Sequence, residues 1–197
     1  MRGFPLRLRL LAFALAGVLG GASAALAATV SPTDWTSVTG EWQLQLVNAD
    51  PRSANTNAYA AVDQSGTRLV YEWTVRFEST TFSLGPAAGL HIMADDGASD
   101  VRGNSYLVFQ DAEFIRLYKA QGGRLNKVGD LPATAAVGET HTYRVEYNSE
   151  SGRMEIYRNG ERVGEWTDSA PLKDGKFISV RTNGTIAVFS NITVTSE

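Results

Sequence analysis

The stretch LVYEWTVRF, residues 69–77, decides the fold class of this chain. Large apolar side chains occupy every second position, and the positions between them carry Val70, Glu72, Thr74 and Arg76. Successive side chains of a β-strand point to opposite faces of a sheet. The stretch therefore predicts a strand whose odd-numbered residues lie in a core and whose even-numbered residues face outward.

Three further stretches alternate in the same way: HTYRVEYN at 141–148, FIRLYK at 114–119 and KFISVRT at 176–182. Between such stretches lie clusters of Gly, Asn and Ser that are typical of tight turns, such as RNGE at 158–161. Strands at a spacing of about 8–12 residues, with almost no helical periodicity, are typical of an all-β sandwich or barrel. The sequence shows no linker or repeat, so we expect one domain over residues 28–197.

The first 27 residues have the features of a signal peptide. Three arginines within the first nine residues precede an apolar run from Leu10 to Leu19, and Ala25-Leu26-Ala27 fits a cleavage site between small residues. The apolar run is too short to span a membrane. We expect cleavage of residues 1–27, export to the extracellular space or cell envelope, and no membrane span in the mature chain.

Composition excludes several classes of function. Three of the 18 basic residues and none of the 21 acidic residues precede Ala28. The expected mature chain therefore has 15 basic and 21 acidic residues, and its net charge is −6. Nucleic acid is therefore not an expected partner. The chain has no cysteine, which excludes disulfides and thiolate chemistry, and its two histidines make a His-rich zinc site an unfavoured interpretation.

The order of motifs resembles the concanavalin A-like lectin and glucanase sandwiches, especially the 3-keto-disaccharide hydrolase domains and related carbohydrate-binding modules. The motifs are GEWQL, YEWTVRF, AAGLHIMADD with NSYLVFQD, HTYRVEYNSESGRMEIYRNGERV and GKFISVRTNGTIAVFSNITV, between Gly40 and Val194. The resemblance implies a two-sheet antiparallel jelly-roll sandwich with a glycan site on the concave face or at its rim. This fold hosts enzymes, lectins and adhesion modules, so it does not decide the function.

One departure from that family bears on catalysis. The motif Glu-x-Asp-x-x-Glu, which supplies the catalytic carboxylates of the related glucanases, is absent. We therefore expect a lectin-like module without its own catalysis. A glycoside hydrolase using two of Glu72, Asp111, Glu146 and Glu155 remains an alternative, because such enzymes need a pair of carboxyl groups. A structural protein of the envelope or matrix is a third interpretation, and the oligomeric state is open.

The segment HIMADDGASDVRGNSYLVF, residues 91–109, contains a loop with many oxygen donors. Asp95, Asp96 and Asp100 could hold a structural calcium ion, which binds oxygen ligands. The spacing does not match an EF-hand loop, and a solvated loop between strands has the same composition. Calcium is thus one hypothesis for this loop and a plain polar connection is the other.

Alternation also predicts which side chains form a glycan site. Sugar sites combine an aromatic surface with planar polar groups. We expect Leu90, Ile92, Leu107 and Phe109 to face the core, together with Ile115, Leu117, Ile178 and Val180. The predicted site is then the outward set His91, Tyr106, Gln110, Arg116, Tyr118 and Arg181. The alternative is that Tyr and Arg are ordinary surface residues of strands, which pair across them.

The tryptophans are weaker candidates. Trp73 and Trp42 alternate with apolar neighbours and are expected in the core, whereas Trp35 and Trp166 could lie at a rim or pack under a loop.

Overall fold

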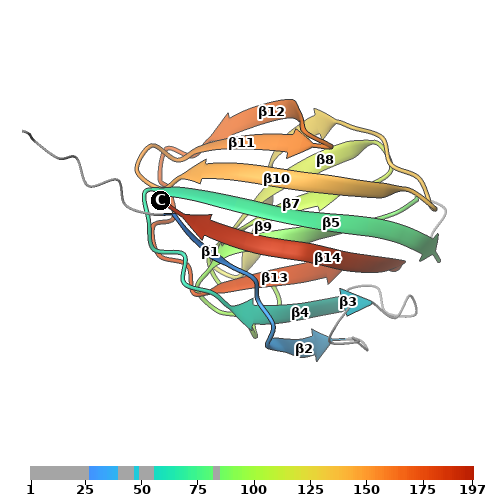
Figure 1. Ribbon diagram of the computed structural model, residues 1–197, viewed down its shortest axis with the longest axis horizontal. Coiled ribbons are helices and arrows are strands. Elements are labelled where there is room, and N and C mark those ends of the chain that lie inside the picture. Colours follow the sequence, from blue (N-terminus) through green and yellow to red (C-terminus); the bar gives the residue numbers. More distant parts are fainter. Residues whose placement is uncertain (1–26, 40–46, 49–55, 82–84) are drawn as a thin grey trace, which may run out of the picture.

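The computed structural model describes residues 27–39, 47–48, 56–81 and 85–197, and this part of the chain is all β. The expected signal peptide lies outside the described residues except for Ala27, and so do GEWQL and Trp42. No helix capable of crossing a membrane occurs in the described ranges. Two antiparallel sheets pack face to face (Figure 1).

The front sheet, nearer the viewer in Figure 1, contains the stretch that opened the sequence analysis. In spatial order its strands are β1 (Ala28–Val30), β14 (Thr185–Ser196), β5 (Arg68–Thr80), β10 (Thr140–Asn148), β11 (Arg153–Arg158) and β12 (Glu161–Thr167), and β3 (Val47–Asn48) also pairs with β14. The first and last strands of the described chain are neighbours, because Ala28 of β1 is paired with Ser196 of β14.

The back sheet has seven strands. In spatial order they are β2 (Trp35–Thr39), β4 (Thr56–Ala61), β13 (Phe177–Thr182), β6 (Ala88–Ala94), β7 (Ser105–Gln110), β8 (Phe114–Gln121) and β9 (Arg124–Pro132). Strands β6 to β9 follow each other in sequence, whereas β13 comes from near the end of the chain and inserts between β4 and β6. This insertion brings Arg181 beside a strand that lies about 90 residues earlier.

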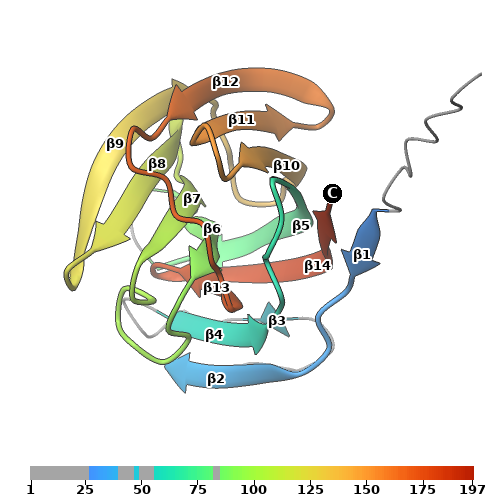
Figure 2. The ribbon, with the colours of Figure 1, turned by 90° about the vertical axis from the view of Figure 1, so that its left-hand side faces the viewer.

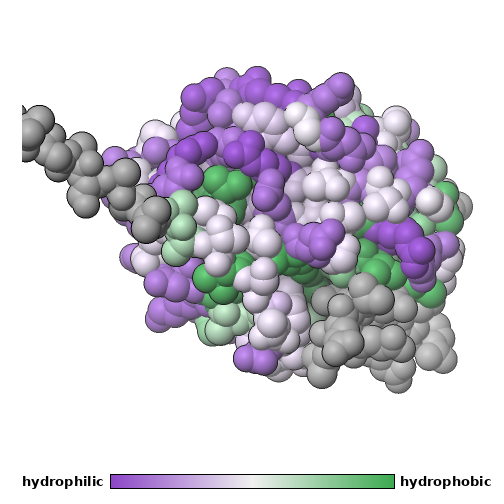
Figure 3. All heavy atoms as spheres, in the orientation of Figure 1, coloured by the Kyte–Doolittle hydropathy of each residue, from purple (hydrophilic) through white to green (hydrophobic). Residues whose placement is uncertain are grey.

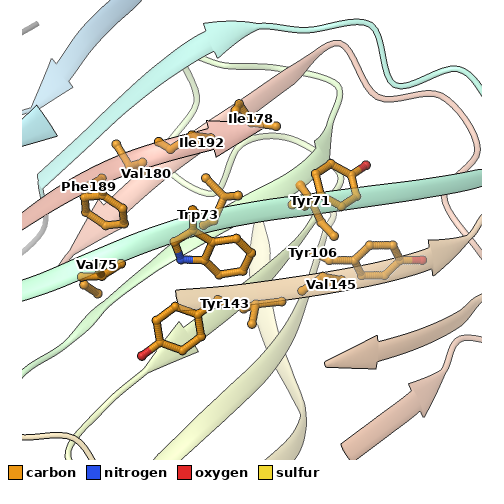
Figure 4. Close-up of a cluster of buried hydrophobic side chains, with 14 of the residues drawn as sticks. Tyr71, Trp73, Val75, Tyr106, Tyr143, Val145, Ile178, Val180, Phe189 and Ile192 are labelled. Atoms are coloured by element: carbon orange, nitrogen blue, oxygen red, sulfur yellow. The ribbon is translucent and has the colours of Figure 1, made fainter. Parts of the chain in front are cut away.

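The core between the sheets confirms the alternation predicted for residues 69–77. Trp73 is 2% exposed and stacks on Tyr143 of the neighbouring strand, with ring centroids 5.3 Å apart and an interplanar angle of 16°. Figure 4 shows Trp73 among side chains from both sheets, including Phe189 from β14 and Val180 from β13. The predicted inward residues of β8 and β13, which are Ile115, Leu117, Ile178 and Val180, are buried as well.

The orientation expected for β7 is wrong. Tyr106 is paired with Ile92, and Val108 with Leu90, so Tyr106 and Val108 face the core. Leu107 and Phe109 point away from the other sheet. The cause lies in the burial of every residue of β7, which is covered on both faces. A strand buried on both faces carries an almost continuous apolar run, and such a run does not show which face is the core.

The side chains of Tyr106 and Gln110 consequently point into the interior, where they form hydrogen bonds, and not toward the outer face. The Tyr106 hydroxyl donates to Oδ2 of Asp168 at 2.6 Å, and Oε1 of Gln110 accepts a hydrogen bond from the Tyr143 hydroxyl at 3.1 Å. Asp168 also pairs with Nζ of Lys119 at 2.5 Å. These bonds satisfy polar groups that would otherwise be costly to bury.

Candidate functional site

The outer face of the back sheet carries two rows of side chains that cross its central strands. Strand pairing aligns Ser179, His91, Leu107 and Tyr118 in one row. The adjacent row contains Arg181, Gly89, Phe109 and Arg116. Each row takes one residue from each of β13, β6, β7 and β8. We call this surface the curved face, because the sheet bends around it.

The back sheet bends around this face. Thr39 of β2 and Leu125 of β9 belong to the two edge strands, which would be roughly 29 Å apart in a flat sheet of seven strands. Both residues nevertheless line one pocket of about 310 Å³. Figure 2 shows β9 and β2 at the two ends of the arc that the back sheet describes. The sheet therefore offers a concave surface to a ligand.

The acidic loop, residues 95–104, folds back over the first of the two rows. Nε of Arg102 donates to Oγ of Ser179 at 2.9 Å, and Gly97 lies so close to the Tyr59 ring that an added Cβ would come within 2.4 Å of it. Ser179, His91 and Leu107 are buried as a result. The loop thus covers the middle of the curved face and leaves the second row more open.

His91 points toward the curved face, as expected, but it is fully buried beneath this loop. Burial lowers the pKa of its imidazole well below the usual range, and the nearby positive charges of Arg181 and Arg102 lower it further. Nδ1 of His91 lies 3.0 Å from Oγ of Ser105. His91 is therefore a neutral residue under the loop, out of reach of a ligand on the surface.

The first pocket lies beside the second row and has a volume of about 540 Å³. Arg116 and Tyr118 of β8 form one wall, with Phe109 of β7 next to them. The remaining lining residues come from three connections between strands and are Gly85, Pro86, Ala87, Asp111, Ala112, Glu113 and Asn183. The pocket combines aromatic surface with carboxylate, amide and guanidinium groups, which is the composition expected for sugar recognition.

Arg116 is held in place by several contacts. Its Nε donates to Oδ2 of Asp111, its Nη1 lies 3.3 Å from Oδ1 of Asp130, and its guanidinium carbon lies 5.3 Å from the centroid of the Phe114 ring. The hydrogen bond with Asp111 raises the pKa of Arg116. A guanidinium fixed in this way loses little conformational entropy when it binds a ligand.

Asp111 is itself positioned by the turn between β7 and β8. Its Oδ1 accepts hydrogen bonds from the backbone N–H groups of Glu113 at 2.9 Å and Phe114 at 2.8 Å. Aspartate commonly organises turns through such bonds. The sequence contains this signal, because Asp111 directly follows the strand, but sequence reasoning considered Asp111 only as a catalytic carboxylate.

The second pocket, of about 310 Å³, lies under the acidic loop at the other end of the second row. It is lined by Thr39, Asn57, Asp100, Val101, Leu125 and Arg181. Burial lowers the pKa of Arg181, and electrostatic interactions with Tyr118 and the Asp100 carboxylate oppose this effect. Arg181 therefore lies within electrostatic range of Asp100, in the same pocket, and of Tyr118, which lines the first pocket.

Four of the six predicted site residues, His91, Arg116, Tyr118 and Arg181, thus lie on the curved face, but the acidic loop covers His91. Sequence reasoning missed Phe109, because the orientation of β7 was inverted. It also missed Asn183 in the first pocket and Asn57 in the second. Both residues reach their pockets through the sheet topology, which local sequence patterns do not show.

The aspartates of the acidic loop hold the backbone of the loop itself. Asp95 accepts bonds from the backbone N–H of Asn104 at 2.8 Å and from its Nδ2 at 2.7 Å, and Asp96 accepts from the N–H of Ala98 at 2.8 Å. Within the described ranges, no group of three or more His, Cys, Asp or Glu side chains is arranged to hold a metal ion. The hydrogen bonds of Asp95 and Asp96 are those of an ordinary polar loop. Calcium binding by Asp95, Asp96 and Asp100 stays a prediction.

Three of the four candidate catalytic carboxylates lie far from the curved face. Glu72, Glu146 and Glu155 belong to the outer face of the front sheet, where Arg144 pairs with Glu72 and Glu146, and Arg153 pairs with Glu155. Figure 3 shows the hydrophilic side chains that gather over β10 to β12 on this face. Only Asp111, in the first pocket, is near the candidate binding surface.

Comparisons with known proteins define the fold. No protein-family model matches the chain, and no curated protein sequence does either. Among solved structures, the carbohydrate-binding module CBM66 from Bacillus subtilis is similar, with a TM-score of 0.66, 22% identity, and coverage of 84% of this chain and 97% of that one. The carbohydrate recognition domain of Emp46p in its metal-free form has a TM-score of 0.63, 12% identity, and coverage of 82% and 87%.

The fold is that of the concanavalin A-like sandwiches. A proposed glycosyl hydrolase from Parabacteroides distasonis shares it as well, with a TM-score of 0.57, 12% identity, and coverage of 83% of this chain and 88% of that one. The expected resemblance and the expected jelly-roll fold are confirmed. Carbohydrate-binding modules, lectin domains and hydrolases are all represented in this fold, so the function has to be argued from the site.

Proposed function

We propose that this chain is a carbohydrate-binding module that holds a glycan in the first pocket of its curved face. The observation that carries the proposal is the fixed guanidinium of Arg116 beside two aromatic rings, Phe109 and Tyr118. The aromatic rings would cover the apolar face of a sugar, and Arg116 would bind its hydroxyl groups. The carbohydrate-binding neighbours of the same fold support this assignment. Export by the signal peptide and the lack of catalysis are parts of the same proposal.

Tyr118 would contribute both its ring and its hydroxyl. Burial raises the pKa of Tyr118 further above neutral pH, and its phenol stays protonated there. It can then donate one hydrogen bond and accept others. This versatility suits a sugar, whose hydroxyl groups are themselves donors and acceptors.

A glycan array followed by calorimetry tests the proposal. Replacing Arg116 by alanine removes charge-assisted hydrogen bonds and should lower the affinity for a bound glycan by roughly ten- to a hundredfold. Replacing Tyr118 by alanine should lower it as well.

Arg162→Ala provides the matched control, since Arg162 is an exposed arginine that pairs with Glu155 and Glu165 on the front sheet. It should leave the affinity unchanged. Equal affinities of the Arg116→Ala and Arg162→Ala variants, with both folded, would exclude the first pocket as the binding site.

A glycoside hydrolase is the second candidate, because Asp111 and Glu113 line the same pocket. Glycosidases use two carboxyl groups on either side of the scissile bond. Release of reducing sugar from any bound glycan, abolished by Glu113→Gln while binding persists, would establish this activity. Binding without release supports the binding module.

A further inference from the structure

The second pocket shares part of the chemistry of the first, although no aromatic residue of the described chain lines it. Each pocket contains one arginine with a nearby carboxylate, Arg116 with Asp111 in the first and Arg181 with Asp100 in the second. Each also has apolar surface, which Val101 and Leu125 supply in the second pocket. An arginine offers donors to sugar hydroxyls and a carboxylate offers acceptors. Two pockets on one face, each with an arginine and a carboxylate, suit two units of one repeating ligand.

The second row connects the pockets. Arg181 and Arg116 stand three strand spacings apart, which places their Cα atoms roughly 14 Å from each other. Between them lie Gly89, which has no side chain, and Phe109, whose Cδ2 is 3.0 Å from the position of a Cβ on Gly89. The Phe109 ring therefore lies over Gly89, between the two arginines.

Asn57 supplies an observation that points to a ligand in the second pocket. This residue is 4% exposed, and its Nδ2 donates to Oγ1 of Thr39 at 3.4 Å. Its Oδ1 is buried and has no hydrogen-bond partner in the described part of the chain. A buried acceptor without a partner is rare and costly, and a hydroxyl donor of a ligand in this pocket would satisfy it.

We propose that the second pocket is a further subsite of the glycan site, so that the ligand is a chain of several sugars lying from Arg116 to Arg181. This inference rests on the proposed function. It assigns an extended oligosaccharide or polysaccharide as the ligand class, whereas the first pocket alone would hold a single terminal unit. The acidic loop then acts as part of the binding surface, through Asp100 and Val101.

The test is calorimetry of the intact protein with cello-, laminari-, xylo- and manno-oligosaccharides, each from monosaccharide to hexasaccharide. For the series that binds, wild-type affinity should rise at least tenfold with length and then level off. Arg181→Ala should remove this rise and leave monosaccharide affinity within about twofold, whereas Arg116→Ala should weaken every length.

Asp100→Asn is a second variant, and because Asp100 is exposed we expect its replacement to leave the fold intact. It should reduce the rise with length as well. A wild-type affinity independent of length, or an unchanged rise in both variants, overturns the second subsite while the first pocket stands. If no series binds, or if Arg116→Ala binds every length normally, the proposed function itself fails.

Discussion

At the scale of single residues, Arg102 carries several energetic costs at once. Its backbone has a φ of 64°, in the left-handed region that long side chains rarely adopt. Its guanidinium is buried, and Nη2 has no hydrogen-bond partner among the described residues. Burial lowers its pKa to about 10. Such costs persist where the surrounding structure compensates for them, and here Arg102 fixes the acidic loop to Ser179 of the curved face.

His91, beneath the same loop, predicts a pH dependence of stability. Its pKa is lowered in the folded protein, so the unfolded chain binds the proton more readily. The stability that neutral His91 provides is complete above the unfolded pKa of about 6.5 and is lost as the pH falls below that value. This residue contributes at most about 1.4 kcal/mol per pH unit to the slope, in the range where the unfolded chain binds the proton and the folded protein does not.

Urea unfolding at several pH values measures this slope. His91→Gln should be less stable at neutral pH but should lose the part of the slope that His91 contributes. His141→Gln, which removes the other histidine, is the control and should keep it. An identical slope in wild type and His91→Gln would contradict the prediction.

At the scale of elements, alternation predicts the orientation of a strand well when one face is exposed to solvent, and poorly when both faces are covered. Residues 69–77 place Glu72 and Arg76 in solvent on one side, so the inward set is evident from the sequence. In β7 the acidic loop and neighbouring side chains cover the outer face, and Leu107 is as buried as Val108. The inverted orientation of Tyr106 and Gln110 follows from that cover, which no local pattern reveals.

The hairpin between β11 and β12 offers a test of turn conformation alone. Asn159 and Gly160 have φ values of 54° and 85°, as a tight two-residue hairpin turn requires. A Cβ on Gly160 would meet no atom within 4 Å, so steric contact plays no part. Gly160→Ala should therefore destabilise the protein by about 1 kcal/mol through its backbone conformation only.

Chemical denaturation measures this cost, and Gly129→Ala is a suitable comparison. Gly129 has no positive φ, and a Cβ there would lie 3.7 Å or more from Leu117, at ordinary contact distance. It should be close to neutral. If both variants have the same stability, the left-handed conformation of Gly160 does not limit the hairpin.

At the scale of the whole molecule, Trp73 tests whether the two sheets unfold together. Its ring contacts the shared core, and Trp73→Ala should cost about 3–5 kcal/mol, a large part of the stability of an ordinary domain. Trp73→Phe fills more of the same space and should cost less. Circular dichroism during urea unfolding should show one transition in each case. Two separate transitions would indicate that the sheets are independent.

The sequence predicted the fold from the order of its motifs, and it predicted part of the site. Arg116 and Tyr118 share one strand, so alternation alone puts them on one face. Arg181 joins them because β13 inserts beside β6, and Asn57 joins because β4 pairs with β13. These contacts are set by topology over long sequence distances. The cover over His91 depends on the path of a loop, which residue types do not specify.

The pairing of Ala28 with Ser196 also has a consequence for how the molecule could be attached. Both residues lie on the front sheet, at its β1 and β14 edge, whereas the two pockets open on the outer surface of the other sheet. Any anchor or neighbouring domain joined at either position would emerge at the same edge. The molecule would then be tethered at one edge, and the curved face would belong to the sheet that does not carry the tether.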